Sequence, residues 1–88
     1  MITFDNFSAY DVEKDLMRFR CYVGEQFILC GVTRAALVAG APHGASSLAE
    51  LKKLYELRTE VIRRAVLNRL ERRGRSEHGP VLVDVGDM

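Results

Sequence analysis

The sequence has few of the residues that build metal sites and covalent cross-links. It contains two cysteines and two histidines among 88 residues. Cys21 and Cys30 form neither a Cys-x-x-Cys pair nor a cluster with zinc-binding spacing, and His43 and His78 lie in glycine-containing segments far from both. We therefore predict that both cysteines are reduced core residues and that the protein uses no metal and no other cofactor.

A strong net charge and a long apolar segment are also lacking. The formal net charge is +1, so the molecule as a whole has no general attraction to nucleic acid or to a membrane. The longest apolar stretches are far too short to span a bilayer, and the first residues show no basic segment followed by an apolar one. These features predict a cytoplasmic protein with no membrane partner.

Catalytic motifs are absent as well. The sequence shows no Ser/His/Asp set, no paired-carboxylate motif and no phosphate-binding glycine loop, and 88 residues are few for a deep pocket. An active site in the loop around His43 is the disfavoured alternative, because a single histidine without a partner is weak support. We predict that the protein is not an enzyme.

What the chain does contain is enough apolar residues to fold. They make up 48% of the sequence, which is ordinary for a globule and argues against disorder. The length fits one small domain, which we place at residues 1–88.

The most pronounced pattern is an amphipathic helix from about Ser47 to about Arg73. Ser47 and Glu50 fit a capping box at its start, and Gly74 is well placed to end it. At 100° per residue, one broad side is apolar and the opposite side is charged. The apolar side consists of Leu48, Leu51, Leu54, Tyr55, Val61, Ile62, Ala65, Val66 and Leu70. An uninterrupted helix of this kind is expected to lie on a hydrophobic core.

A β-hairpin is predicted between residues 15 and 33, where apolar side chains alternate with polar or aromatic ones. Gly24-Glu25 suits a type II′ turn, which requires a positive φ at its first central residue. This turn pairs Cys21 with Ile28 and Phe19 with Cys30. The two cysteines then share a face but sit diagonally, which is poor geometry for a disulfide.

The other face of this hairpin mixes cationic and aromatic groups. Arg18, Arg20 and Tyr22 stand there near Phe27, Leu29 and Gly31. This face is either a wetted sheet surface or a contact surface.

Three weaker signals complete the fold. Ile2 and Phe4 indicate a short edge strand, followed by turn or loop in which Phe7 and Tyr10 either cover the core or form an exposed aromatic pair. Thr33 is an N-cap for a short helix over residues 34–39. Residues 81–85 form a closing strand with Val81, Val83 and Val85 on one face.

These elements predict an α+β fold in the order β-β-β-α-α-β. The predicted sheet is small and antiparallel, and it contains the hairpin and the C-terminal strand, with or without a short N-terminal edge strand. One long helix and one short helix cover the sheet.

The order of elements resembles that of a family of small bacterial proteins known as domain of unknown function 1488. The similar stretches are Ile2-Thr3-Phe4, Met17-Arg18-Phe19, Cys30-Gly31-Val32-Thr33-Arg34-Ala35-Ala36-Leu37, and the series Tyr55, Arg58, Ile62 and Ala65 in the long helix. The resemblance implies a small bacterial α+β domain, with no activity or catalytic set to carry over. Arg58 occupies a position typical of the family.

Two arginines interrupt the apolar side of the long helix. Arg58 and Arg69 lie along its middle, where an unpaired buried charge is very costly. The favoured interpretation is structural, either an ion pair or a stem packed on apolar surface. The alternative is an anion site.

Two functional hypotheses follow. The first is a non-enzymatic protein-interaction or structural module, with an unknown protein partner or a second copy in a homodimer, since sheet edges and exposed leucines such as Leu57 and Leu67 can meet a partner. The alternative is an accessory protein that binds nucleic acid through the arginine-rich end of the long helix, although these arginines point in many directions. The candidate interaction residues are Arg58, Arg63, Arg64, Arg69, Arg72 and Arg73 on the helix, and Arg18 and Arg20 on the hairpin.

Overall fold

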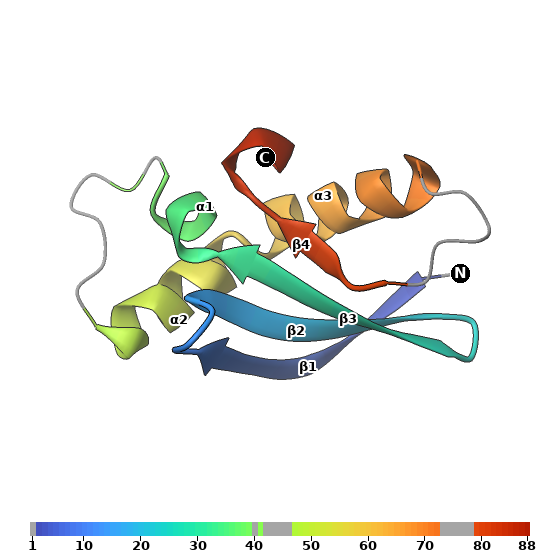
Figure 1. The fold of residues 1–88 in the computed structure, drawn as a ribbon, viewed down its shortest axis with the longest axis horizontal. Helices are drawn as coiled ribbons and strands as arrows, with labels where there is room; N and C mark the ends of the chain where they lie inside the picture. Colours follow the sequence, from blue (N-terminus) through green and yellow to red (C-terminus); the bar gives the residue numbers. More distant parts are fainter. Residues whose placement is uncertain (1, 40, 42–46, 73–78) are drawn as a thin grey trace.

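The computed structural model describes residues 2–39, 41, 47–72 and 79–88, and they form a four-stranded sheet packed against helices (Figure 1). The elements are β1 (Ile2–Asp11), β2 (Leu16–Val23), β3 (Gln26–Thr33), α1 (Arg34–Val38), α2 (Leu48–Leu57), α3 (Thr59–Arg72), β4 (Val81–Val83) and the 3₁₀ helix η1 (Val85–Asp87). The strands are ordered β1-β2-β3-β4 across the sheet. The predicted α+β class is confirmed.

The hairpin of β2 and β3 has the predicted register. Cys21 lies opposite Ile28, and Phe19 lies opposite Cys30, in an antiparallel pair. Gly24 has a φ of 62°, as the first position of a type II′ turn requires. Both cysteines are buried thiols in the core, with their sulfur atoms 3.7 Å apart.

The prediction for the N-terminus is wrong in part. β1 is a ten-residue strand, not a short strand followed by a loop. Its pairing with β2 shifts between Phe4 and Ser8, where β1 has two residues more than its partner. Arg20 holds this bulge: its guanidinium pairs with the Asp5 carboxylate at 2.8 Å and lies 4.2 Å from the centre of the Phe7 ring. Phe7 thus stacks on Arg20 at the surface.

Tyr10 behaves as predicted and packs against the core. Its hydroxyl donates a hydrogen bond to the Asp15 carboxylate, in the turn between β1 and β2. Burial, followed by this hydrogen bond, raises the pKa of Tyr10 to about 12.

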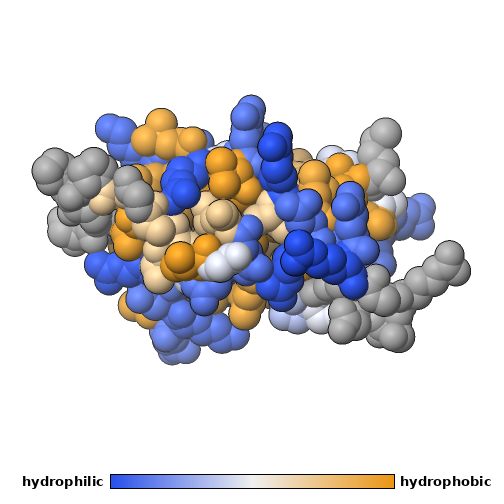
Figure 2. Space-filling view, turned by 90° about the horizontal axis from the view of Figure 1, so that it is seen from above, coloured by the Kyte–Doolittle hydropathy of each residue, from blue (hydrophilic) through white to orange (hydrophobic). Residues whose placement is uncertain are grey.

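The closing strand runs in the other direction from the prediction. β4 pairs in parallel with β3, so the sheet is mixed and not wholly antiparallel. The chain leaves β3 and returns through α1, α2 and α3, and a helical crossover of this kind brings the next strand back parallel. β4 ends at Val83 because the Asp84 carboxylate caps η1, which leaves Val85 half exposed. Seen from above the view of Figure 1, the molecule shows hydrophobic patches among hydrophilic side chains (Figure 2).

The long helix is interrupted at Arg58, contrary to the prediction. Arg58 has φ −108° and ψ 17°, and α3 begins at the next residue. The Thr59 hydroxyl donates to the carbonyls of Tyr55 at 2.9 Å and Glu56 at 3.0 Å. Because a side-chain hydroxyl binds these carbonyls, the backbone ladder is disturbed at this point.

Both predicted N-caps are confirmed. The Thr33 hydroxyl accepts from the Ala36 N–H at 3.1 Å, and the Ser47 hydroxyl accepts from the Glu50 N–H at 3.2 Å. The predicted end of the long helix at Gly74 lies outside the described residues.

The hydrophobic core lies between one face of the sheet and the helices. The Phe19 and Tyr55 rings are 5.6 Å apart across it. The helix side consists of Ala36, Leu37, Leu51, Tyr55, Ile62, Ala65 and Val66, and the sheet side of Met17, Phe19, Cys21, Ile28, Cys30, Val32, Val81 and Val83. Most of the predicted apolar side of the long helix therefore packs on the core despite the interruption, but Leu48 and Val61, which were predicted to belong to it, are 55% and 47% exposed. Within the described ranges, no helix combines the length and apolar character needed to cross a membrane.

Candidate interaction face

The face of the sheet that none of the described helices covers is the candidate site, and we call it the open face. Strand alternation places on it Leu16, Arg18, Tyr22, Phe27, Leu29 and Leu82. Figure 1 shows the helices gathered on the other side of the sheet. Most of these residues belong to the hairpin surface predicted from the sequence.

Aromatic side chains cover one end of the open face. The Tyr22 and Phe27 rings lie edge to face, with centroids 5.7 Å apart. Phe27 is 51% exposed although it belongs to a strand that is otherwise largely buried. A half-exposed aromatic residue on a rigid sheet is a common anchor in protein contacts.

Leucines cover the centre of the open face. Gly31 pairs with Arg18 on one side and with Leu82 on the other. A Cβ atom at Gly31 would lie 3.0 Å from Leu16 Cδ1 and 3.1 Å from Leu82 Cδ2, so the two leucines fold over the glycine. Leu82 stays 47% exposed, which leaves an apolar surface facing solvent.

A shallow pocket of about 200 Å³ opens beside these leucines. Its floor includes Leu16, Leu29 and Leu82, and its rim includes Asp11, Lys14 and Arg18. The Arg18 guanidinium is 3.9 Å from the Asp11 carboxylate, with the arginine side chain 45% exposed, so this ion pair is weak. The rim therefore offers charges of both signs to a partner.

The structure spreads the other candidate arginines over the molecule. Arg20 is engaged with the β1 bulge, as described above. The Arg63 guanidinium lies 4.8 Å from the centre of the Phe4 ring. Arg64 and Arg72 are exposed on α3, and Arg73 lies outside the described residues. Arg18 and the helix arginines lie on opposite sides of the sheet, so they do not form one basic surface.

Arg58 binds the end of a neighbouring helix. Its guanidinium donates to the carbonyls of Ala36 at 2.9 Å and Ala39 at 2.6 Å, and more weakly to Leu37 at 3.5 Å. These carbonyls belong to the C-terminal turn of α1, where the backbone has no intrahelical donors left. The positive charge also suits the negative end of the helix dipole.

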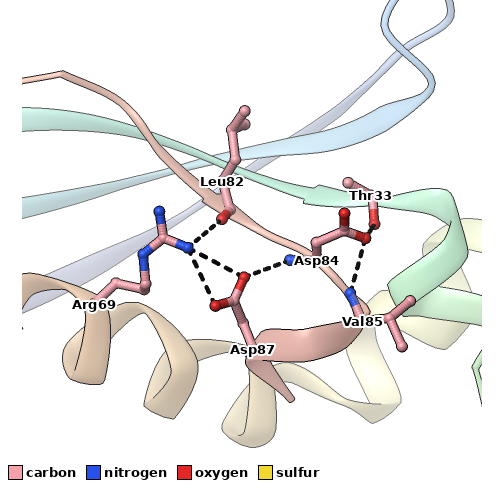
Figure 3. Close-up of polar contacts among 6 residues, drawn as sticks. All are labelled: Thr33, Arg69, Leu82, Asp84, Val85 and Asp87. Atoms are coloured by element: carbon pink, nitrogen blue, oxygen red, sulfur yellow. Dashed lines mark hydrogen bonds and ion pairs between the residues drawn. The ribbon is translucent and has the colours of Figure 1, made fainter.

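Arg69 anchors the C-terminal turn (Figure 3). Its guanidinium contacts the two carboxylate oxygens of Asp87 at 3.1 and 3.2 Å, and the Leu82 carbonyl at 3.4 Å. Asp87 also accepts from the Asp84 N–H at 2.9 Å. The Asp84 hydrogen bond, together with Arg69, lowers the pKa of Asp87.

The same network reaches α1 through Asp84. The Asp84 carboxylate accepts from the Thr33 hydroxyl at 2.8 Å and from the Val85 N–H at 2.8 Å. Since Thr33 also caps α1, the C-terminal turn, β3 and α1 are joined by one chain of hydrogen bonds (Figure 3).

The sequence interpretation missed the contribution of Leu16 and Leu82 to the open face. Leu82 carried a usable signal, because the alternation of Val81, Leu82 and Val83 places its side chain away from the valines. Leu16 carried the same signal, because it alternates with Met17 and so shares a face of β2 with Arg18, whereas its packing over Gly31 could not be foreseen.

Comparisons with known proteins identify the fold. No family model and no curated protein matches the sequence. Among solved structures, the fold is similar to that of a protein of unknown function from the DUF1488 family of Shewanella loihica PV-4. The TM-score is 0.82 with 18% sequence identity, over 93% of this chain and 90% of that chain. The resemblance to domain of unknown function 1488 is thus confirmed by the shared fold, and the comparison assigns no activity.

Proposed function

We propose that this domain is a non-enzymatic interaction module whose open face binds a second copy of the chain. The observation that supports the proposal is the half exposure of Phe27 and Leu82 on a sheet face that lies opposite α1, α2 and α3. Scattered exposed apolar residues are normal, but these two belong to one rigid surface together with Tyr22, Leu16 and Leu29.

The charges around the pocket favour a second copy over an unrelated partner. In a two-fold symmetric dimer, both molecules use the same surface patch. If a residue of the first copy contacts a different residue of the second copy, the reverse contact is therefore also made. A patch of this kind must be self-complementary. The rim fulfils this condition, because Asp11 of one copy can face Lys14 or Arg18 of the other.

The size of the face is also sufficient. The domain measures 39 × 23 × 23 Å, so one long face covers roughly 900 Å². Specific interfaces commonly bury about 800 Å² on each partner. A dimer through the open face therefore needs most of one side of the sheet, including its aromatic end.

Light scattering coupled to size exclusion, over a range of protein concentrations, tests the proposal. We expect a concentration-dependent dimer for the natural chain and a monomer for Phe27→Ser and Leu82→Ser, with unchanged circular dichroism. Leu57→Ser is the matched control, because Leu57 is 73% exposed but lies on α2. A natural chain that stays monomeric at about 1 mM, the scale of weak association, would refute the proposal, as would loss of the dimer in the Leu57 variant alone.

The nucleic-acid alternative stays a prediction. Arg64 and Arg72 are exposed on α3 and are the described residues that best fit it. Binding that depends on phosphate contacts weakens steeply with salt. Retardation of RNA or DNA at low salt that disappears in the Arg64→Gln, Arg72→Gln double variant would support it, and no retardation at low salt would remove it.

A further inference from the structure

A second pocket, with polar walls, lies between β1 and the helices. Its volume is about 280 Å³. β1 contributes Asp5 and Ser8, α2 contributes Lys52, Tyr55 and Glu56, and α3 contributes Arg63. It is separate from the pocket of the open face and shares no lining residue with it.

Two irregularities of the backbone meet at this pocket. The bulge between Phe4 and Ser8 supplies its β1 wall, and Thr59, the first residue after the helix interruption at Arg58, lies on the opposite wall. Bulges and interrupted helices are over-represented next to functional sites, because they re-aim side chains that a regular element would direct elsewhere. Here they open a polar space beside an otherwise apolar core.

Arg63 has unused hydrogen-bonding capacity at this place. Its Nε atom is buried without a hydrogen-bond partner, as is the Nε atom of Arg20, so the donors that Arg63 offers to a ligand are its two terminal nitrogens. Among the residues that the structure describes, no carboxylate forms an ion pair with Arg63, whose guanidinium lies against the Phe4 ring. A guanidinium that is positioned by an aromatic ring and lacks a counter-ion is suited to bind a carboxylate through two parallel N–H donors.

The neighbouring groups define the rest of the ligand. Lys52 adds a second cation, and Tyr55, only 8% exposed, brings a phenol to the wall. Burial is the main cause that raises the pKa of Tyr55, so its hydroxyl remains a hydrogen-bond donor at neutral pH. Asp5 is already paired with Arg20, whereas Glu56 is exposed at the pocket and can meet a positive group.

We propose that this pocket binds a zwitterionic small molecule of the amino-acid class. The ligand carboxylate contacts Arg63 and Lys52, and its ammonium group faces Glu56. A dianion or a simple carboxylate is a poorer match, because it leaves Glu56 facing negative charge. The volume lies just below the range of about 300–1,000 Å³ typical of ligand pockets, which suits a small metabolite.

The test is an NMR titration of the intact chain with each of the twenty free amino acids. Propionate and propylamine serve as matched probes that carry only one of the two charges. We expect at least one amino acid to shift the amide signals of Asn6, Ser8 and Thr59 saturably, with a dissociation constant of about 1 mM or tighter. The two single-charge probes should bind at least about tenfold more weakly.

Variants tie the binding to the pocket. Arg63→Gln should weaken it at least about tenfold, which corresponds to about 1.4 kcal/mol. Arg64→Gln removes the same charge from the next, exposed residue and should leave the dissociation constant unchanged. Lys52→Gln, at an exposed position, gives a second test if the Arg63 variant fails to fold, and it should also weaken binding. Glu56→Gln should bring the affinity for the amino acid down to that for propionate.

Three results would overturn the proposal. They are the absence of saturable shifts with every amino acid, propionate binding as tightly as the best amino acid, and equal losses in the Arg63 and Arg64 variants. None of them bears on the dimer of the open face, which is measured without ligand.

Discussion

Arg58 gives the sharpest prediction about stability, because one side chain connects the helix interruption to the end of α1. Its guanidinium donates to carbonyls of the last turn of α1, at 2.9 Å for Ala36 and 2.6 Å for Ala39. Arg58→Met keeps most of the aliphatic stem and removes these donors. Any loss of stability in this variant therefore reports on the hydrogen bonds and the charge.

The expected loss follows from these contacts. A hydrogen bond with one charged partner contributes about 1.5–3 kcal/mol. Two such bonds on a half-buried side chain amount to about 2–4 kcal/mol, since solvent partly satisfies the freed carbonyls. At about 0.05–0.15 kcal/mol per residue, the whole domain has roughly 4–13 kcal/mol. The substitution thus removes a large share of the stability.

Urea unfolding followed by circular dichroism at 222 nm measures this loss. With a slope of about 1–2 kcal/mol per molar urea, the midpoint should fall by roughly 1–4 M. Arg64→Met is the control, because Arg64 is exposed, and should change the free energy of unfolding by less than about 0.5 kcal/mol. If Arg58→Met also stays within 0.5 kcal/mol of the natural chain, the hydrogen bonds to α1 do not support the fold and our reasoning is wrong.

Three further predictions concern single positions. Gly24→Ala should lower the free energy of unfolding by about 1 kcal/mol, because a φ of 62° is strained for alanine although no atom crowds the position. Gly31→Ala should lower it by less, since the ends of the leucine side chains that crowd this position can move. Equal losses of the two variants in urea unfolding would contradict this ranking. Asp87, with its lowered pKa, contributes stability that is complete at neutral pH and is lost as pH falls below about 4, so urea midpoints from pH 7 to pH 3 should fall less in Asp87→Asn. Arg69→Gln should lower stability at pH 7 by up to about 1 kcal/mol, and no change would show that the partly exposed ion pair with Asp87 contributes nothing.

Local rules were enough to predict the hairpin and the helix starts. The Gly24-Glu25 turn sets the register of β2 and β3 by itself, because a two-residue loop leaves one pairing. Thr33 and Ser47 act within three residues of their own positions. These features depend on short stretches of chain, so the sequence contains all the information that they need.

The bulge and the helix interruption depend on contacts between distant residues. β1 stays a strand through Asp5 and Phe7 because Arg20, on the neighbouring strand, binds both side chains. Arg58 leaves the helical conformation where its guanidinium reaches α1, some 20 residues earlier in the chain. Thr59 was the one local signal, since a threonine hydroxyl can bind preceding carbonyls, but threonine is common in unbroken helices too.

The direction of β4 could have been predicted. A strand that follows another through a helical connection, and lies beside it, is normally parallel to it. The alternation of Val81 and Val83 identified the buried face correctly but carries no information on direction. Topology, and not side-chain pattern, decides this point.

The candidate sites show the same division between local and distant information. The sequence placed Tyr22 and Phe27 on one face of the hairpin, and the structure shows them in contact. It could not reveal the polar pocket, because the β1 wall of that pocket is formed by the bulge between Phe4 and Ser8, which the sequence did not predict. A site built at two irregularities is as hard to predict as the irregularities themselves.

The arginines that looked like a basic surface mostly serve another purpose. Arg20 holds the β1 bulge, Arg58 the end of α1, and Arg69 the C-terminal turn, and each does so through carboxylates or backbone carbonyls of a segment that lacks regular partners. Five donors in a fixed geometry make arginine the suitable side chain for this task in a domain with a small core. The count of arginines is therefore a poor guide to function here. Arg63 is the more informative arginine, because it forms no ion pair with a described carboxylate and its buried Nε atom has no hydrogen-bond partner.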